Sequence, residues 1–293
     1  MSSGTPVEVR STTDVVGPMR FSATRLGTWM KCPLQAKFKY TDRLPSDRSA
    51  YMAFGICVHA VLDEFYDSPD AEAAVERFLD LWEDPSLVRA AIDYWPDGTD
   101  YIKLRDRGED SIRTYFEKQK LDKGKKIKAE HKFLVPFGEF ELTGYVDLLE
   151  VRKGVRGNVL RIIDFKTGMY IPRQSVLNLD IQFAVYDYAS RQEEFWVGNG
   201  IDYPGLPNGE EMFHLYKSIP RVPVWYAVAK GKEVMSRERD EDDHLRLYRL
   251  CKEIHHAETL GVYVPKIAED TCVFCDYTRE CAIPIDDTPV GEY

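Results

Sequence analysis

Several features are missing from the 293-residue sequence, and each absence removes a class of protein. No apolar run approaches the roughly 20 residues that a membrane-spanning helix needs. Residues 1–20 do not combine a basic start with an apolar stretch, so they do not resemble a signal peptide, and we expect a cytoplasmic protein. Internal repeats and low-complexity segments are absent as well, which argues against a repeat array or a largely disordered chain.

Basic residues are fewer than acidic ones, with 39 Lys and Arg against 49 Asp and Glu, and the formal net charge is −10. This balance excludes a protein that is coated with basic surface for binding phosphates. A local basic groove is still compatible with it, and six lysines form a candidate patch: Lys118, Lys120, Lys123, Lys125, Lys126 and Lys128. A solvated helix end and loop would have the same composition.

The spacing of apolar residues predicts helices and strands in an order that is typical of α/β proteins. We expect a helix that Ser22 caps and that carries Leu26, Trp29 and Met30, a second helical turn from Pro33, and helices over 50–66, 70–83, 100–121, 176–192 and 240–258. We expect strands over 129–136, 140–151, 159–166 and 224–229. The stretch from Trp196 to Pro223 shows no clear core pattern.

These elements predict an α/β fold with a mixed central sheet that is flanked by helices. Residues 21–285 form a single expected domain, with a helical lobe over about 67–127, a core over about 129–258 and a cysteine-bearing segment over 265–285. A loose arm over residues 1–20 and an acidic tail over 286–293 complete the predicted organisation.

The two central strands can be placed in register from the sequence between them. If their loop centres between Val155 and Arg156, antiparallel pairing places Asp147 opposite Asp164, with both side chains on one face. Lys166 lies two residues beyond Asp164 and therefore shares that face. Two adjacent carboxylates repel each other, and a divalent metal such as Mg²⁺ stabilises them and can polarise a phosphodiester. The alternative is a structural salt bridge between Lys166 and the aspartates.

Four short motifs resemble those of RecB-like PD-(D/E)xK nucleases. Gly144–Asp147 is similar to the family's G-x-x-D, and Asp164–Gly168 is similar to its D-x-K-[ST]-G. Gly55–His59 matches G-x-x-x-H, Gln182–Tyr186 matches Q-x-x-x-Y, and all four stand in the family's order. The chain departs from the pattern at Val146, where many relatives have proline, and at Asp164, where many have glutamate. Both departures occur within this branch. No G-x-x-x-x-G-K-[ST] motif occurs, so we expect a stand-alone nuclease domain, not a helicase–nuclease fusion.

The resemblance implies a restriction-endonuclease-like core and a role for each motif residue. His59, Asp147 and Asp164 would be ligands of Mg²⁺ or Mn²⁺, and the Phe165 carbonyl could be a further one. Lys166 would orient or activate the attacking water. Gln182 and Tyr186, four residues apart on one helix face, would contact DNA or the active-site groups. Glu130 is a weaker candidate for a second-shell or metal role.

Three of the six cysteines, Cys272, Cys275 and Cys281, are spaced C-x₂-C-x₅-C. Thiolates this close favour a soft metal centre, and a fourth ligand would complete either a Zn²⁺ site or a [4Fe–4S] cluster. The CRISPR-adaptation exonuclease family and the AddB nuclease domain, which this chain resembles, carry one cysteine before the nuclease core and three after it, and they bind [4Fe–4S]. Cys32 fits the first of these positions, so the resemblance implies a structural iron–sulfur cluster. The other two cysteines, Cys57 and Cys251, are expected to be buried free thiols.

Two hypotheses follow for function. The first is a metal-dependent DNA exonuclease that acts on DNA ends or single strands. The second is a DNA-processing accessory subunit that binds DNA or a partner protein, or a second copy of itself, and cuts weakly or only in complex. The set of Asp147, Asp164 and Lys166 favours the enzyme, whereas the acidic net charge leaves room for a partner.

Overall fold

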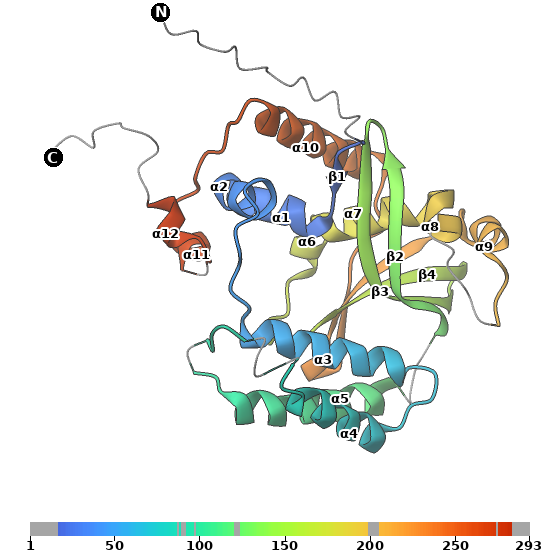
Figure 1. The fold of residues 1–293 in the computed structure, drawn as a ribbon. Coiled ribbons are helices and arrows are strands. Elements are labelled where there is room, and N and C mark those ends of the chain that lie inside the picture. The colour runs from blue at the N-terminus through green and yellow to red at the C-terminus, as the bar shows by residue number, and fades with distance from the viewer. Residues whose placement is uncertain are drawn as a thin grey trace, which may run out of the picture.

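The computed structural model describes residues 17–86, 88, 92–96, 98–119, 124–198, 205–273 and 275–282. The predicted acidic tail, most of the predicted arm, and Lys120 and Lys123 of the lysine patch lie outside these residues. The described chain forms an α/β fold, in which helices flank both faces of a mixed six-stranded sheet (Figure 1). This confirms the predicted fold class.

The sheet is built around the long central strand β3. Its strands are β1 (Arg20–Phe21), β2 (Lys125–Phe137), β3 (Phe140–Gly154), β4 (Gly157–Lys166), β5 (Arg221–Ala227) and β6 (Lys232–Met235). They follow the order β1-β3-β4-β5-β6, and β2 pairs with β3 as a hairpin. The β1–β3 and β4–β5 pairs are parallel, and the other pairs are antiparallel.

Most of the predicted helices are present, and most of the longer ones begin at a side-chain cap. The longer ones are α1 (Ala23–Lys31), α3 (Ala50–Glu64), α4 (Ala71–Glu83), α5 (Tyr101–Gln119), α7 (Ile181–Ser190), α9 (Gly209–Tyr216) and α10 (Glu241–Thr259). The shorter ones are α2 (Pro33–Ala36), α6 (Gln174–Leu177), α8 (Glu193–Val197), α11 (Glu269–Cys272) and α12 (Thr278–Cys281). The Ser22 hydroxyl accepts a hydrogen bond from the Arg25 amide at 3.1 Å, which starts α1 where the sequence predicts it.

The predicted single helix over 176–192 was wrong. The chain forms α6 and α7 instead, because the Asp180 carboxylate accepts hydrogen bonds from the amides of Gln182 and Phe183 and starts a new helix. The sequence also gave no warning of β1, β6, α8 or α9. The end of α8 and all of α9 lie in the stretch from Trp196 to Pro223, part of which is outside the described residues.

Two hydrophobic cores lie on opposite faces of the sheet. The first core packs α1, α7 and α10 against one face, and it includes Leu149 and Ile162. The second core packs α3, α4 and α5 against the other face, and it includes Leu148 and Ile163 (Figure 1). Because side chains alternate along a strand, Asp164 follows Ile163 on the face that α7 covers.

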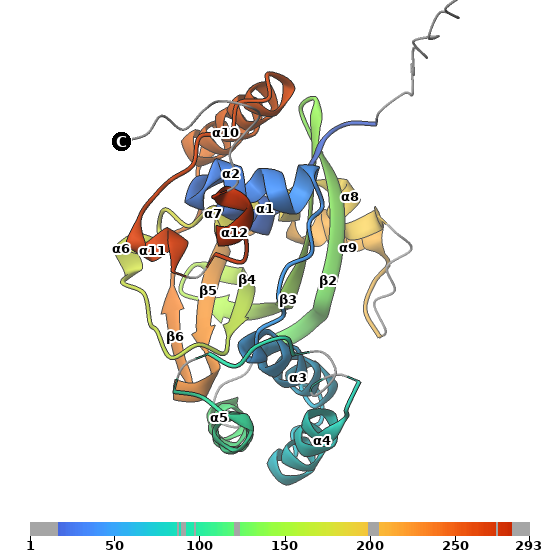
Figure 2. The ribbon, with the colours of Figure 1, turned by 60° about the vertical axis from the view of Figure 1, so that its left-hand side comes forward.

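Segments from the two ends of the chain meet beside α2. The Lys266 amide donates a hydrogen bond to the Cys32 sulfur at 3.4 Å, and the Tyr277 hydroxyl donates one to the Leu44 carbonyl at 3.4 Å. Residues of α11 and α12 line one cavity with Cys32 and Leu34, and Figure 2 shows α12 in front of α2. In the described part of the chain, no helix has both the length and the apolar character of a membrane span.

Candidate active site

The hairpin of β3 and β4 has the predicted register. Gly154 pairs with Gly157 and Leu148 pairs with Ile163, so the turn centres between Val155 and Arg156. The ladder ends at Leu148 and Ile163, and Asp147 and Asp164 come one position further on. There the Phe165 amide donates to the Asp147 carboxylate at 2.6 Å. The strand ends thus bring both carboxylates to one place.

Lys166, Asp164 and two residues of α7 form a connected polar network. The Lys166 ammonium lies 2.7 Å from one Asp164 oxygen, and the Gln182 amide donates to the other at 2.8 Å. Lys166 also donates to the Gln182 side-chain oxygen at 3.3 Å, and Gln182 lies 2.8 Å from the Tyr186 hydroxyl. Gln182 therefore holds the carboxylate, the lysine and the tyrosine in fixed relative positions.

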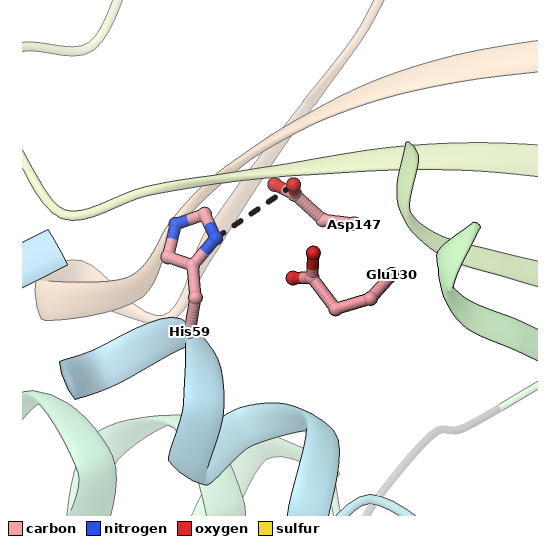
Figure 3. Close-up of side chains that lie close together, drawn as sticks. All are labelled: His59, Glu130 and Asp147. Carbon is pink, nitrogen blue, oxygen red and sulfur yellow. Dashed lines mark ion pairs between the residues drawn. The ribbon is translucent and has the colours of Figure 1, made fainter. Parts of the chain in front are cut away.

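A second group of side chains gathers on the other side of Asp147. One potential ligand atom from each of His59, Glu130 and Asp147 lies within 4.8 Å of the other two (Figure 3). The His59 Nδ1 atom is 3.7 Å from Asp147 Oδ1. His59 comes from α3, Glu130 from β2 and Asp147 from β3, so three elements converge here. Asp164 is not among the three.

Burial sets the protonation of these groups. Burial and the nearby Lys166 lower the pKa of His59 to about 4, so its ring is neutral at pH 7 and can act as a ligand. The Phe165 main chain, which the sequence predicts as a further ligand, hydrogen-bonds this ring. Burial and the charge of Asp164 raise the pKa of Asp147 to about 8. The repulsion between these carboxylates is the kind that a bound cation relieves.

Lys166 remains an ammonium group in this setting. Burial lowers its pKa, but Asp164, Asp147 and Asp180 outweigh that effect, and the net pKa is raised. Burial also raises the pKa of Asp164, and the charge and hydrogen bond of Lys166 oppose this shift. The ring of Trp225, which pairs with Asp164 across the β4–β5 ladder, lies 5.2 Å from the Lys166 nitrogen and supports it on one side.

Asp180 is a site residue that was not predicted from the sequence. This residue caps α7 and acts electrostatically on Asp164, Lys166 and Tyr186. Its signal was present as a helix-capping residue two positions before Gln182, at a point where a single continuous helix was expected.

The donor set fits a divalent cation. A neutral imidazole and two carboxylates offer one nitrogen and several oxygens, which suit Mn²⁺ well and suit Mg²⁺ through the carboxylates and retained waters. Two of these residues, His59 and Glu130, also border a hollow of about 800 Å³ beside α3, whose wall includes Asp63 as well. A substrate phosphate could therefore approach the cluster from this side.

The four cysteines predicted to form one centre line one cavity of about 220 Å³ between the two ends of the chain. Cys32 is buried, Cys272 and Cys275 are half-buried, and Cys281 is exposed. Burial and then the other three cysteines raise the pKa of Cys281, which reflects how close the four groups lie. The remaining two, Cys57 and Cys251, are buried free thiols as predicted.

Fold and site together define a nuclease-type core, with a carboxylate pair and a lysine at the end of a central hairpin. Residues 20–282 match the model of the PD-(D/E)XK nuclease superfamily, and the chain belongs to this superfamily. No curated protein matches the chain. Among solved structures, one titled "Crystal structure of SSO0001" is similar over 92% of this chain and 89% of that chain, with 10% sequence identity and a TM-score of 0.36. A likeness at this level carries no argument about function.

Proposed function

We propose that the protein is a Mg²⁺- or Mn²⁺-dependent DNA exonuclease that acts on DNA ends or in single strands. The observation that carries this proposal is the pair of groups that flank Asp147. On one side lie potential metal ligands from His59 and Glu130, and on the other lie Asp164 and the Lys166 ammonium. Membership of the superfamily supports the nuclease, and the resemblance to the RecB-like branch supports action on DNA ends.

In this proposal each site residue has one task. Asp147, Asp164 and His59 hold the cation, with the Phe165 carbonyl as a further ligand; the bound metal would polarise the phosphate and lower the pKa of a water. Lys166 orients the attacking water and stabilises negative charge on the phosphate. Gln182 keeps Lys166 and Asp164 in position through hydrogen bonds of 3.3 and 2.8 Å, and Tyr186 supports Gln182.

We also infer that Cys32, Cys272, Cys275 and Cys281 hold a structural [4Fe–4S] cluster, with Zn²⁺ as the other occupant to be tested. The four sulfurs line one cavity. Tetrahedral Zn²⁺ with bonds of about 2.3 Å would draw its thiolates to about 3.8 Å from one another. The iron, acid-labile sulfide and zinc contents of the purified protein decide between the two occupants.

The test is cleavage of end-labelled single- and double-stranded DNA by protein that is purified without oxygen. Mg²⁺, Mn²⁺ or EDTA is added, and the wild type is compared with Lys166→Ala. We expect metal-dependent cutting and a loss of about 100-fold or more in the variant. Lys153→Ala is the matched control, because Lys153 is an exposed residue on the same hairpin and far from its catalytic end.

A folded, brown wild type that cuts nothing with either metal would contradict the enzyme proposal. The protein would then be better described as an accessory subunit that binds DNA or a protein partner. The formal net charge of −10 is the observation that favours this second function, because it leaves little basic surface for DNA alone.

A further inference from the structure

Glu130 has an unusual backbone for its position in the sheet. It lies inside β2 between Ala129, which pairs with Leu148, and His131, which pairs with Val146. Yet its φ is 45°, in the left-handed region that glutamate rarely adopts. Among the described non-glycine residues, only Arg43 shares a positive φ. A conformation of this kind is strained and persists where its surroundings enforce it.

The pairs on either side place Glu130 directly across from Asp147, but these two residues do not pair through their backbones. The ladder is interrupted here, as it also is by a bulge between Lys126 and Lys128, and the β3–β4 ladder ends beside this position. The Glu130 side chain instead reaches the cluster with His59 and Asp147 (Figure 3). The irregular backbone therefore coincides with the delivery of a third ligand atom to the site.

Left without a cation, this arrangement is unfavourable. Glu130 and Asp147 bring two carboxylates together, and the charge of Glu130 adds to the repulsion that Asp147 experiences. In the described residues around them, the charge of Lys166 is engaged with Asp164 on the other side of Asp147.

We propose that Glu130 is itself a ligand of the divalent cation, and that its left-handed backbone serves to turn its carboxylate to His59 and Asp147. This inference rests on the proposed metal site, and it assigns to Glu130 a direct bond in place of a supporting role. The cation position that it defines lies on the solvent side of Asp147 and opens into the hollow beside α3.

The test is Mn²⁺ binding to the whole protein without DNA, measured by titration calorimetry and by the electron paramagnetic resonance of free Mn²⁺. We expect Glu130→Gln to weaken Mn²⁺ binding at least about tenfold. Asp63→Asn is the matched control: Asp63 borders the same hollow and contributes no atom to the cluster, so the variant loses the same charge without losing a ligand. Its affinity should stay within about twofold of the wild type.

Equal Mn²⁺ affinities for Glu130→Gln and Asp63→Asn would overturn the proposal, and so would a wild type that binds no Mn²⁺. Failure of the proposed function looks different. A wild type that binds Mn²⁺ through Glu130 and cuts no DNA would refute the nuclease activity and leave the ligand assignment intact.

A second substitution of Glu130 tests whether its left-handed backbone is strained. Glu130→Gly and Glu130→Gln both remove the carboxylate, but only glycine relaxes at a positive φ. In EDTA we expect Glu130→Gly to melt at a higher temperature than Glu130→Gln. At equal Mn²⁺ concentration, both variants should show a smaller rise in melting temperature than the wild type. A glycine variant that melts below the glutamine variant would show that the left-handed backbone carries no strain, and would refute that part of the proposal.

Discussion

The structure explains why the first residue of the G-x-x-D motif, Gly144, is a glycine. A Cβ atom at this position would lie 2.9 Å from the Phe133 ring and 3.6 Å from the Tyr186 ring. Phe133 is fully buried in the first core, so the ring has little freedom to move. Glycine is needed here because β3 passes close to an aromatic ring that is packed beside the candidate site.

We therefore expect Gly144→Ala to lower the free energy of unfolding by about 2 kcal/mol, since overpacking a core of this kind costs about 1–3 kcal/mol. Gly168→Ala is the control, because a Cβ there meets nothing within 4 Å. Urea denaturation of both variants beside the wild type measures the difference. Equal urea midpoints for Gly144→Ala and Gly168→Ala would show that the Phe133 ring moves aside without loss of stability.

The position of a side chain could be predicted from the sequence where it lies on a regular strand. It could not be predicted where the backbone is irregular. Strand pairing places Asp147, Asp164 and Lys166 correctly, because their register follows from one hairpin turn. The turn of Glu130 toward the same site depends on a positive φ, which no pattern of apolar residues signals. Asp180 was missed for a related reason, since a cap is hard to see inside an otherwise continuous helical pattern.

At the scale of elements, Asp187 of α7 contacts both α10 and the segment that precedes α10. This fully buried carboxylate lies 2.7 Å from the Arg191 side chain and 3.2 Å from His244 Nε2, and it accepts from the Arg239 amide at 3.3 Å. Burial alone would raise its pKa, but the hydrogen bonds of His244 and Arg191 outweigh burial and the net pKa is lowered.

Because the pKa of Asp187 is lowered in the folded state, the free energy of unfolding depends on pH. The unfolded carboxyl takes up its proton near pH 3.9, whereas the folded one holds its charge to lower pH. The stabilisation is therefore complete above the unfolded pKa and is lost as the pH falls through the folded one. We expect Asp187→Asn to lower the free energy of unfolding by about 3 kcal/mol at pH 7, with a smaller difference from the wild type at pH 3.

Chemical denaturation at both pH values measures the two differences. Asp242→Asn, on the exposed face of α10, serves as the control and should change stability by less than about 0.5 kcal/mol at either pH. A difference for Asp187→Asn that stays constant between pH 7 and pH 3 would count against the linkage.

Most elements that are long enough to repeat an apolar face were predicted, and most short ones were not. The 15 residues of α3 and the 19 of α10 repeat their apolar face often enough to be recognised. The five residues of α8 and the four of β6 are too few to show any period, and packing against larger neighbours fixes them. Boundaries moved by only a few residues where a cap or a turn glycine stands at the end.

At the scale of the whole molecule, two segments that are some 240 residues apart in the chain meet at the cavity that the four cysteines line. We expect Cys32→Ser to lose the iron, the inorganic sulfide and the brown colour, and to melt at a lower temperature, because closing so long a loop restricts the unfolded chain. Cys251→Ala is the control. It opens a cavity in the first core and should also lower the melting temperature, but it should keep its iron.

Iron and acid-labile sulfide per chain, with zinc measured in parallel, decide this prediction. A colourless wild type with one zinc per chain would replace the iron–sulfur cluster by a zinc site and leave the connecting role unchanged. Iron that persists in Cys32→Ser would remove this residue from the ligand set.

The two cores on opposite faces of the sheet have a consequence for how the active site can vary. His59 is carried by α3 and the second core, whereas Gln182 and Tyr186 are carried by α7 and the first core. Substitutions within one core can therefore shift the helix on that side without moving the other. Under the proposed function, substitutions in the packing of α3, α4 and α5 would act on the cation through His59, whereas substitutions in the packing around α7 would act through Gln182 on both Lys166 and Asp164.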